Sequence, residues 1–258
     1  MGTSASSKGP GSRISLDPPW LQSENPHEEE QPPLAPPMRF AGARRGLTEY
    51  IRSGNRDSLG KSLGHYSRTG MGGAHRVAQR MKATAGSASR IFNFFQEVRA
   101  STDESLRAWV ESLKQERVST NDLINHFVEK VLPLKGTLDE ESCRKSMDMA
   151  LTELIDENPT IDLFQLNDND IWQLVRLFVQ QEAYQRLNTD LGKKFEEVQI
   201  SPMEMVTRQS AMKEYLRSEL DAQITKAREL EQGQHGANVD RIILIAIENT
   251  FSVFEEML

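Results

Sequence analysis

Apolar residues recur at helical spacing from Phe40 to the end of the chain. Leu59, Leu63 and Tyr66 are one example, because residues three and four positions apart share a face of an α-helix. A half-buried strand would instead alternate apolar and polar residues, and the sequence contains no convincing alternation of this kind. The pattern therefore predicts an all-α, multi-helix domain.

Start and stop signals for helices divide this pattern into segments. In the basic part they predict a short helix around 47–51 that ends at Ser53-Gly54-Asn55, and a second helix from Asp57 or Ser58 to Gly70. A hinge at Gly70, Gly72 and Gly73 then precedes a long segment over 74–99. The helices that follow are predicted to begin at Thr102 or Asp103, Ser119 or Thr120, Asp139, Asp168 or Asn169, Ser201 and Asn238. The helix that begins near residue 168 could extend to Phe195. The last helix, over 238–258, is apolar around most of its circumference, so we expect it at the centre of the core.

Proline is concentrated at the start of the chain, where residues 1–37 hold eight of the eleven prolines. Such a composition is typical of a disordered or polyproline-like leader. Within it, Pro18, Pro19 and Trp20 form a candidate docking anchor for a partner, although the tryptophan could equally be an incidental apolar residue. We therefore predict three regions: the leader at 1–37, a helical segment rich in glycine and arginine at 38–100, and a helical domain at 101–258.

Charge is strongly segregated between these regions. Residues 38–100 carry 12 Lys and Arg against 3 Asp and Glu, whereas residues 101–258 carry 17 against 30. The basic segment could dock on the acidic domain, on a partner or on phosphates. The candidates for a phosphate or partner contact are Arg44, Arg45, Arg68, Arg76 and Arg80. Tyr50 and Tyr66 would be available to stack on bases if the partner were a nucleic acid.

A glycine follows Met1, in the sequence MGTSASSKGPG. Removal of Met1 would expose the amine of Gly2, and an α-amino group has a pKa of about 7.7 to 8.0 against about 10.4 for lysine. Thr3, Ser4 and the small residues after them have almost nothing to bury, so this tether could enter the cleft of another enzyme. The alternative is an ordinary frayed terminus.

The sequence contains no motif typical of an active site or a metal site. The stretch Gly70 to Gly73 is not followed by Gly-Lys-Ser/Thr, the histidines have no HExxH spacing, and no GxSxG elbow is present. Cys143 is expected to be a half-buried helix residue and not a nucleophile. We therefore predict no catalytic residue, no metal ligand and no bound cofactor.

Targeting signals are also missing from the sequence. Its longest aliphatic run, over 242–247, is far shorter than the roughly 20 residues that a membrane span needs, and no apolar stretch is typical of a signal peptide. The single cysteine excludes an internal disulfide. These features predict a cytoplasmic protein without a membrane partner.

An ordered set of short motifs resembles a known family. The set consists of MGTSASSKGPG, LDPPW, a proline-rich stretch, SGNRDSLGKSLGHYSRTGMGG, Arg76 and Gln79-Arg80-Met81. It covers about the first 100 residues and is similar to the B component of the bacterial Qat antiphage defence system. The acidic helical part carries no motif that we can match.

The resemblance implies a four-protein operon with a KAP-type P-loop ATPase, a QueC-like enzyme and a TatD-like nuclease. It further implies that the QueC-like enzyme joins a 7-deazaguanine derivative to the amine of Gly2, so that the chain is a non-enzymatic defence component. Two other functions stay open. The start also fits the M-G-x-x-x-[ST] pattern of an N-myristoylated adaptor if the source is eukaryotic, and the basic segment fits a protein that binds nucleic acid.

Overall fold

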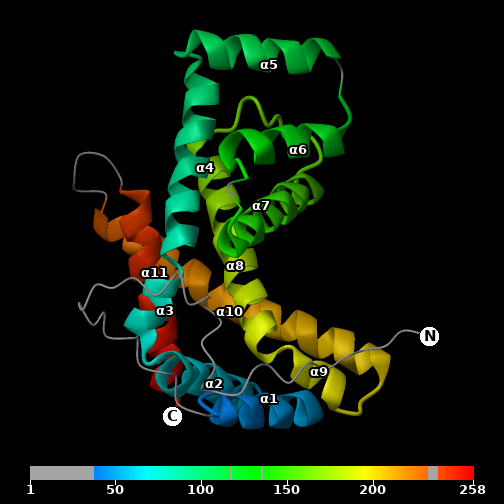
Figure 1. Ribbon diagram of the computed structural model, residues 1–258, viewed down its shortest axis with the longest axis vertical. Coiled ribbons are helices and arrows are strands. Elements are labelled where there is room, and N and C mark those ends of the chain that lie inside the picture. The colour runs from blue at the N-terminus through cyan, green and yellow to red at the C-terminus, as the bar shows by residue number, and fades with distance from the viewer. Residues whose placement is uncertain (1–37, 117, 135, 232–237) are drawn as a thin grey trace, which may run out of the picture. The chain divides into compact units, whose positions relative to one another are not determined.

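The computed structural model describes residues 38–116, 118–134, 136–231 and 238–258, and all regular structure in these residues is helical (Figure 1). The predicted all-α fold is confirmed for them. The helices are α1 (Ala41–Ser53), α2 (Arg56–His65), the π-helix η2 (Tyr66–Met71), α3 (Ala74–Arg80), α4 (Lys82–Ala100), α5 (Glu104–Glu116), α6 (Thr120–Val131), α7 (Leu138–Glu157), α8 (Asp168–Leu191), α9 (Lys193–Glu197), α10 (Pro202–Glu231) and α11 (Val239–Glu255).

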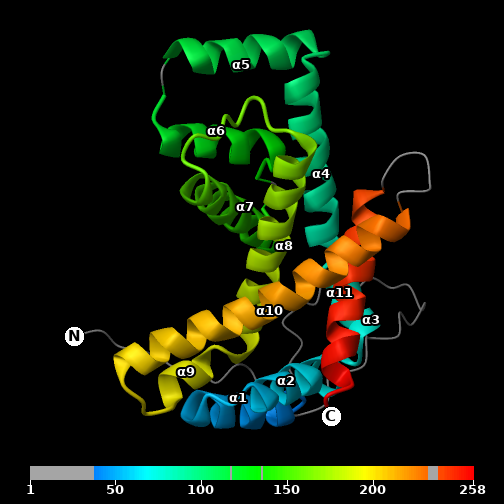
Figure 2. The same ribbon diagram turned by 180° about the vertical axis from the view of Figure 1, so that it is seen from behind.

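Met38–Leu258 form one compact unit. Helices of the basic segment pack directly on helices of the acidic part: α4 runs beside α8, and α11 packs on α2, α3 and α4 (Figures 1 and 2). The change of charge near residue 100 therefore does not separate two compact units.

Several helix ends lie where the side chains predicted them. Gly54 ends α1 in the left-handed conformation, with a φ of 73° that favours glycine. Ser119 caps α6, and its Oγ accepts a hydrogen bond of 3.2 Å from the Asp122 amide. Such caps satisfy amide groups that the first turn of a helix leaves without partners.

The predicted starts of α2 and α7 were wrong by one or two residues, because an earlier side chain provides the cap, whereas α8 begins at Asp168 as predicted. Asn55 caps α2, and its Oδ1 accepts from the Asp57 amide at 2.8 Å. Thr137 and Asn167 cap α7 and α8, each in a capping box with the acidic residue three positions later. Asp139 and Asp168 lie in the first turns, where a carboxylate favours the helix dipole.

Two long predicted helices are interrupted. The segment over 74–99 is divided at Met81, where φ is -95° and ψ is 16°, and α4 starts at the next residue. The helix from residue 168 ends at Leu191, and the short α9 follows Gly192. The apolar period continues across both interruptions, so the pattern of side chains did not reveal them.

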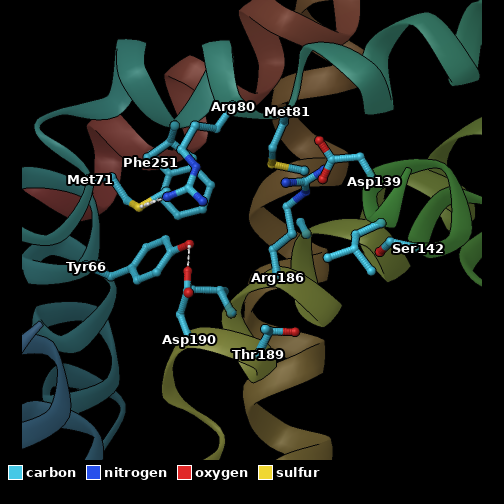
Figure 3. A pocket seen from close by; sticks show the side chains of 14 residues that line it. Tyr66, Met71, Arg80, Met81, Asp139, Ser142, Arg186, Thr189, Asp190 and Phe251 are labelled. Atoms are coloured by element: carbon cyan, nitrogen blue, oxygen red, sulfur yellow. Dashed lines mark hydrogen bonds and ion pairs between the residues drawn. The ribbon is translucent and has the colours of Figure 1, made fainter. Parts of the chain in front are cut away.

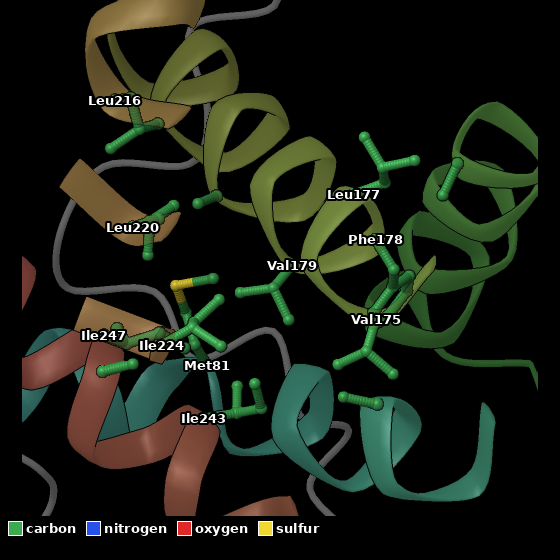
Figure 4. Close-up of a cluster of buried hydrophobic side chains, with 14 of the residues drawn as sticks. Met81, Val175, Leu177, Phe178, Val179, Leu216, Leu220, Ile224, Ile243 and Ile247 are labelled. Carbon is green, nitrogen blue, oxygen red and sulfur yellow. The ribbon is translucent and has the colours of Figure 1, made fainter. Parts of the chain in front are cut away.

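The last helix, α11, lies at the centre of the core as predicted. It packs on α10 as well as on α2, α3 and α4. Figure 4 shows Ile243 and Ile247 of α11 near Ile224 of α10, Val179 of α8 and Met81, and all five side chains are buried. Burial of a large aliphatic side chain contributes roughly 1.5 to 3 kcal/mol, so this contact is a main source of stability.

A second group of apolar contacts is aromatic. Phe95 of α4 and Phe127 of α6 are buried, with ring centroids 5.2 Å apart. Phe94 and Trp109 surround Phe127 with edge contacts at 6.0 and 5.7 Å. Edge-to-face geometry at these distances is favourable for aromatic rings, so the group fixes α4 against α5 and α6.

Candidate functional site

The five arginines predicted to contact a partner or phosphates are all exposed. Arg44 and Arg45 lie on α1, Arg68 lies in η2, and Arg76 and Arg80 lie on α3. None of them forms an ion pair with a carboxylate in the part of the chain that the structure describes. Their charge is therefore not neutralised by the described fold.

Docking of the basic segment on the acidic part uses few charges. The ion pairs that join the two are Arg99 to Asp168, at 2.8 Å, and His75 to Glu248, at 3.2 Å, within the described residues. Apolar contacts of α3, α4 and α11 hold the segment instead. The five candidate arginines thus remain accessible to a partner.

The two tyrosines proposed for stacking are not accessible. Tyr50 and Tyr66 are each only 2% exposed, and both belong to the core. The Tyr50 hydroxyl donates to the Arg208 carbonyl at 2.9 Å. The prediction that these rings stack on bases was therefore wrong: the apolar spacing that placed them on helical faces also buries them.

Arg80 lines a pocket of about 420 Å³ to which none of the other four arginines contributes (Figure 3). The lining residues come from η2, α3, α7, α8 and α11, and from Met81 between α3 and α4. They are Tyr66, Met71, Val77, Arg80, Met81, Leu138, Asp139, Ser142, Ala183, Arg186, Leu187, Thr189, Asp190 and Phe251. The pocket therefore lies where the basic segment meets the acidic part.

One side of this pocket is fixed by Tyr66. Its hydroxyl donates a hydrogen bond of 2.9 Å to Oδ2 of Asp190, and its ring stacks on Phe40 with centroids 5.5 Å apart. Burial raises the pKa of the Tyr66 hydroxyl far above its usual range, and the Asp190 carboxylate adds to the effect. Tyr66 is therefore a neutral donor at physiological pH.

The opposite side is built on Glu182, a fully buried carboxylate on α8. Its oxygens accept hydrogen bonds from Ser142 and Ser146, both at 3.0 Å, and from Nε of Arg186 at 3.1 Å. Burial raises the pKa of Glu182 above its ordinary value, while Arg186 and the two serines oppose the shift. A buried carboxylate needs such partners because an unpaired one is costly.

The charge of Arg186 is paired with two carboxylates. Besides Glu182, it binds Oδ1 of Asp139 through Nη2 at 3.1 Å. Arg80 has no such partner: its one hydrogen bond to a described residue goes to the Met71 sulfur, at 3.3 Å. Of the two guanidinium groups at the pocket, that of Arg80 is the one without a carboxylate partner among the described residues.

The polar residues of α8 were not among the site residues predicted from the sequence. Glu182 follows the apolar run 177–179, and Arg186 stands one helical turn later, so the pair carries an i, i+4 signal. A glutamate on the apolar face of a predicted core helix was the signal in the sequence that could have revealed this buried carboxylate. The role of Asp190 required the fold, because 124 residues separate it from Tyr66.

Cys143 is more buried than expected. It is 1% exposed, and burial raises the pKa of its thiol to about 11, with a further contribution from Glu182. It is therefore a protonated core residue near neutral pH. Within the described residues, no three His, Cys, Asp or Glu side chains are grouped so that they could hold a metal ion.

The remaining predicted site residues are Gly2, Thr3, Ser4, Pro18, Pro19 and Trp20, and they lie outside the described residues. No helix that the structure describes combines the length and the apolar composition of a membrane span.

Residues 72–254 match a family model, described as Qat anti-phage system associated protein QatB. No curated protein and no solved structure matches the chain. The matched span runs from the end of the glycine hinge to α11, so it includes Arg76 and residues 79–81 but lies mostly after the other motifs that carry the resemblance. Because this span is more than half of the sequence, the chain belongs to the QatB family of the Qat anti-phage system.

Proposed function

We propose that this protein acts in the Qat system as a non-catalytic component, and that the amine of Gly2 accepts a deazaguanine from a QueC-like partner. The family match over residues 72–254 is the observation that carries the proposal, because it assigns the chain to the defence system. The QueC-like enzyme, a KAP-type ATPase and a TatD-like nuclease are the partners proposed within that system.

The sequence around Gly2 supports the acceptor role. An α-amine with a pKa of about 7.7 to 8.0 is a free nucleophile far more often than the lysine amine at neutral pH. The residues from Thr3 to Gly11 are small or polar, so they offer no bulky side chain that would obstruct an enzyme cleft.

The exposed arginines support assembly with an acidic protein surface. Arg44, Arg45 and Arg52 lie on α1, and they have no carboxylate within ion-pair distance among the described residues. Charges that the fold leaves unpaired steer encounters with an oppositely charged partner and contribute to specificity. In this proposal α1 and α3 present the contact surface for another Qat component.

Phage protection tests the proposal in cells that express the other Qat components. Gly2→Pro should abolish protection, because proline converts the primary amine into a hindered secondary amine. Lys8→Arg is the matched control and should protect like the parent protein, since it keeps the charge of the tether and leaves Gly2 unchanged. Full protection by Gly2→Pro would contradict the acceptor role.

A second candidate function is binding to nucleic-acid phosphates through the same arginines. Their exposure without carboxylate partners favours it, whereas the burial of Tyr50 and Tyr66 removes the stacking contribution. Binding to single-stranded DNA or RNA that weakens steeply with salt would support this function. If substitution of these arginines prevents assembly with the other Qat components, and the parent protein binds no nucleic acid, the results favour a protein partner.

A further inference from the structure

The pocket at the meeting of η2, α3, α7, α8 and α11 contains a cation that the described fold does not neutralise. Arg80 is exposed, and its hydrogen bond to the Met71 sulfur uses a weak acceptor. A guanidinium group binds best to an oxyanion, because its donors match two oxygens at once. A ligand that fits the pocket should therefore carry an anionic group toward Arg80.

The second polar group of the pocket, the Asp190 carboxylate, can accept a hydrogen bond from a ligand. Asp190 accepts from the Tyr66 hydroxyl with Oδ2, and its other oxygen accepts no hydrogen bond from a described residue. An ionised carboxylate can only accept hydrogen bonds. The neighbouring Thr189 hydroxyl does not fill this position, since it donates to the Gln185 carbonyl at 2.9 Å.

The walls between these groups are largely apolar. The apolar residues of the lining include Val77, Met81, Leu187 and Phe251. Figure 3 shows that Phe251 lies beside Arg80, and that the Tyr66 hydroxyl points at Asp190. Pockets for small molecules usually have volumes of about 300 to 1,000 Å³, with apolar walls and a few convergent polar groups. The volume of about 420 Å³ lies in this range.

We infer that this pocket binds a nucleotide, with the phosphate on Arg80, an N–H group of the base on Asp190 and the ring against the apolar wall. A bare phosphate would leave the wall and Asp190 unused, and the Asp190 carboxylate would repel it. The charge of Arg186 is already paired with Glu182 and Asp139, which leaves Arg80 as the cation for the phosphate. A free nucleotide and the terminal nucleotide of a strand offer the same three groups.

Calorimetric titration of the full chain tests the inference. The probes are AMP, GMP, CMP and UMP at one fixed salt concentration, with inorganic phosphate, the four nucleosides and a short 5′-phosphorylated oligonucleotide in parallel. At least one mononucleotide should bind saturably at one site per chain, and more tightly than phosphate or its own nucleoside. Tighter binding of the oligonucleotide would identify the strand end as the source.

Single substitutions locate the site. Arg80→Met should weaken binding of the best mononucleotide at least tenfold, and Asp190→Asn should weaken it because the amide can keep the Tyr66 hydrogen bond only by turning its N–H₂ toward the base. Lys82→Met is the matched control: it removes an exposed positive charge two residues from Arg80, outside this pocket, and should change the affinity less than twofold. Circular dichroism checks that each variant keeps its helical content.

Three results would overturn the inference. They are the absence of saturable binding for all four mononucleotides, equal losses in Arg80→Met and Lys82→Met, and binding of inorganic phosphate as tightly as the best nucleotide. The first result would leave no ligand of this class, and the second would reduce the effect to general surface charge. The third would show that the apolar wall and Asp190 contribute nothing.

Discussion

Tyr66 and Asp190 connect two parts of the chain that differ in charge. Tyr66 lies in η2 of the basic segment and Asp190 lies near the end of α8, and the hydrogen bond between them is 2.9 Å long. The tyrosine ring also contacts Phe251 of α11, with ring centroids 6.0 Å apart. This single side chain therefore links the π-helical turn to both α8 and the central helix of the core.

Tyr66→Phe should lower the free energy of unfolding by about 1 kcal/mol, because it removes one partly buried hydrogen bond and keeps the ring contacts. Urea denaturation followed by circular dichroism measures the change. Thr69→Val is a useful comparison, since the Thr69 hydroxyl binds only its own helical turn at an exposed position. Equal stabilities of Tyr66→Phe and the parent protein would show that the Asp190 contact contributes nothing.

Glu182 should make stability depend on pH with a defined sign. Its folded-state pKa is raised above the ordinary value of 4.5, chiefly by burial, so the folded state holds the proton more tightly than the unfolded state. The resulting stabilisation is complete below the unfolded pKa and is lost as the pH rises through the folded pKa.

The comparison of the parent protein with Glu182→Gln isolates this effect from other carboxylates. The difference in unfolding free energy, parent minus variant, should fall as the pH increases from about 4.5 toward neutrality. Urea denaturation at a series of pH values measures it. A difference that increases with pH would mean that Arg186 and the serines outweigh burial and lower the pKa.

Reversal of the exposed charges on α1 should affect assembly and leave stability nearly unchanged. Arg44→Glu combined with Arg45→Glu breaks no ion pair within the described residues, so the change in unfolding free energy should stay within about 0.5 kcal/mol. Co-purification with the other Qat components should nevertheless decrease strongly.

Arg99→Glu provides the contrast for this experiment. It breaks the ion pair of 2.8 Å with Asp168, at a partly buried position, and should destabilise the fold more than the double variant does. Unchanged co-purification of the double variant would exclude this part of α1 from the contact surface.

The fold followed from the sequence where a local signal sets it. The spacing of apolar residues predicted the helices and the central position of 238–258, and Gly54 and Ser119 set their helix ends through a positive φ and a side-chain cap. The break at Met81 left no such signal, because the apolar period passes through it. The π-helix over Tyr66–Met71 was also missed, since its residues differ from α-helical ones in backbone hydrogen bonding and not in composition.

The candidate site was less predictable because it depends on contacts between distant elements. Arg80 was selected, with four other arginines, from the charge of its segment. Only the fold distinguished it from those four, because it places Arg80 at a pocket with Asp190 and Arg186. The buried Glu182 was overlooked, since the acidic residues that the sequence singled out were those at predicted helix starts. Gly2 and the docking anchor at 18–20 stay predictions.

The central claim is that Gly2 accepts a deazaguanine, and intact mass spectrometry tests it most directly. Protein purified from cells that express the QueC-like partner should lack Met1 and carry the mass of a deazaguanine derivative on the N-terminal peptide. The added mass should disappear when the partner is omitted or when Gly2 is replaced by proline, and should persist in Lys8→Arg. An unmodified N-terminus in the presence of the partner, a myristoyl mass in its place, or an added mass that maps to Lys8 would contradict the account.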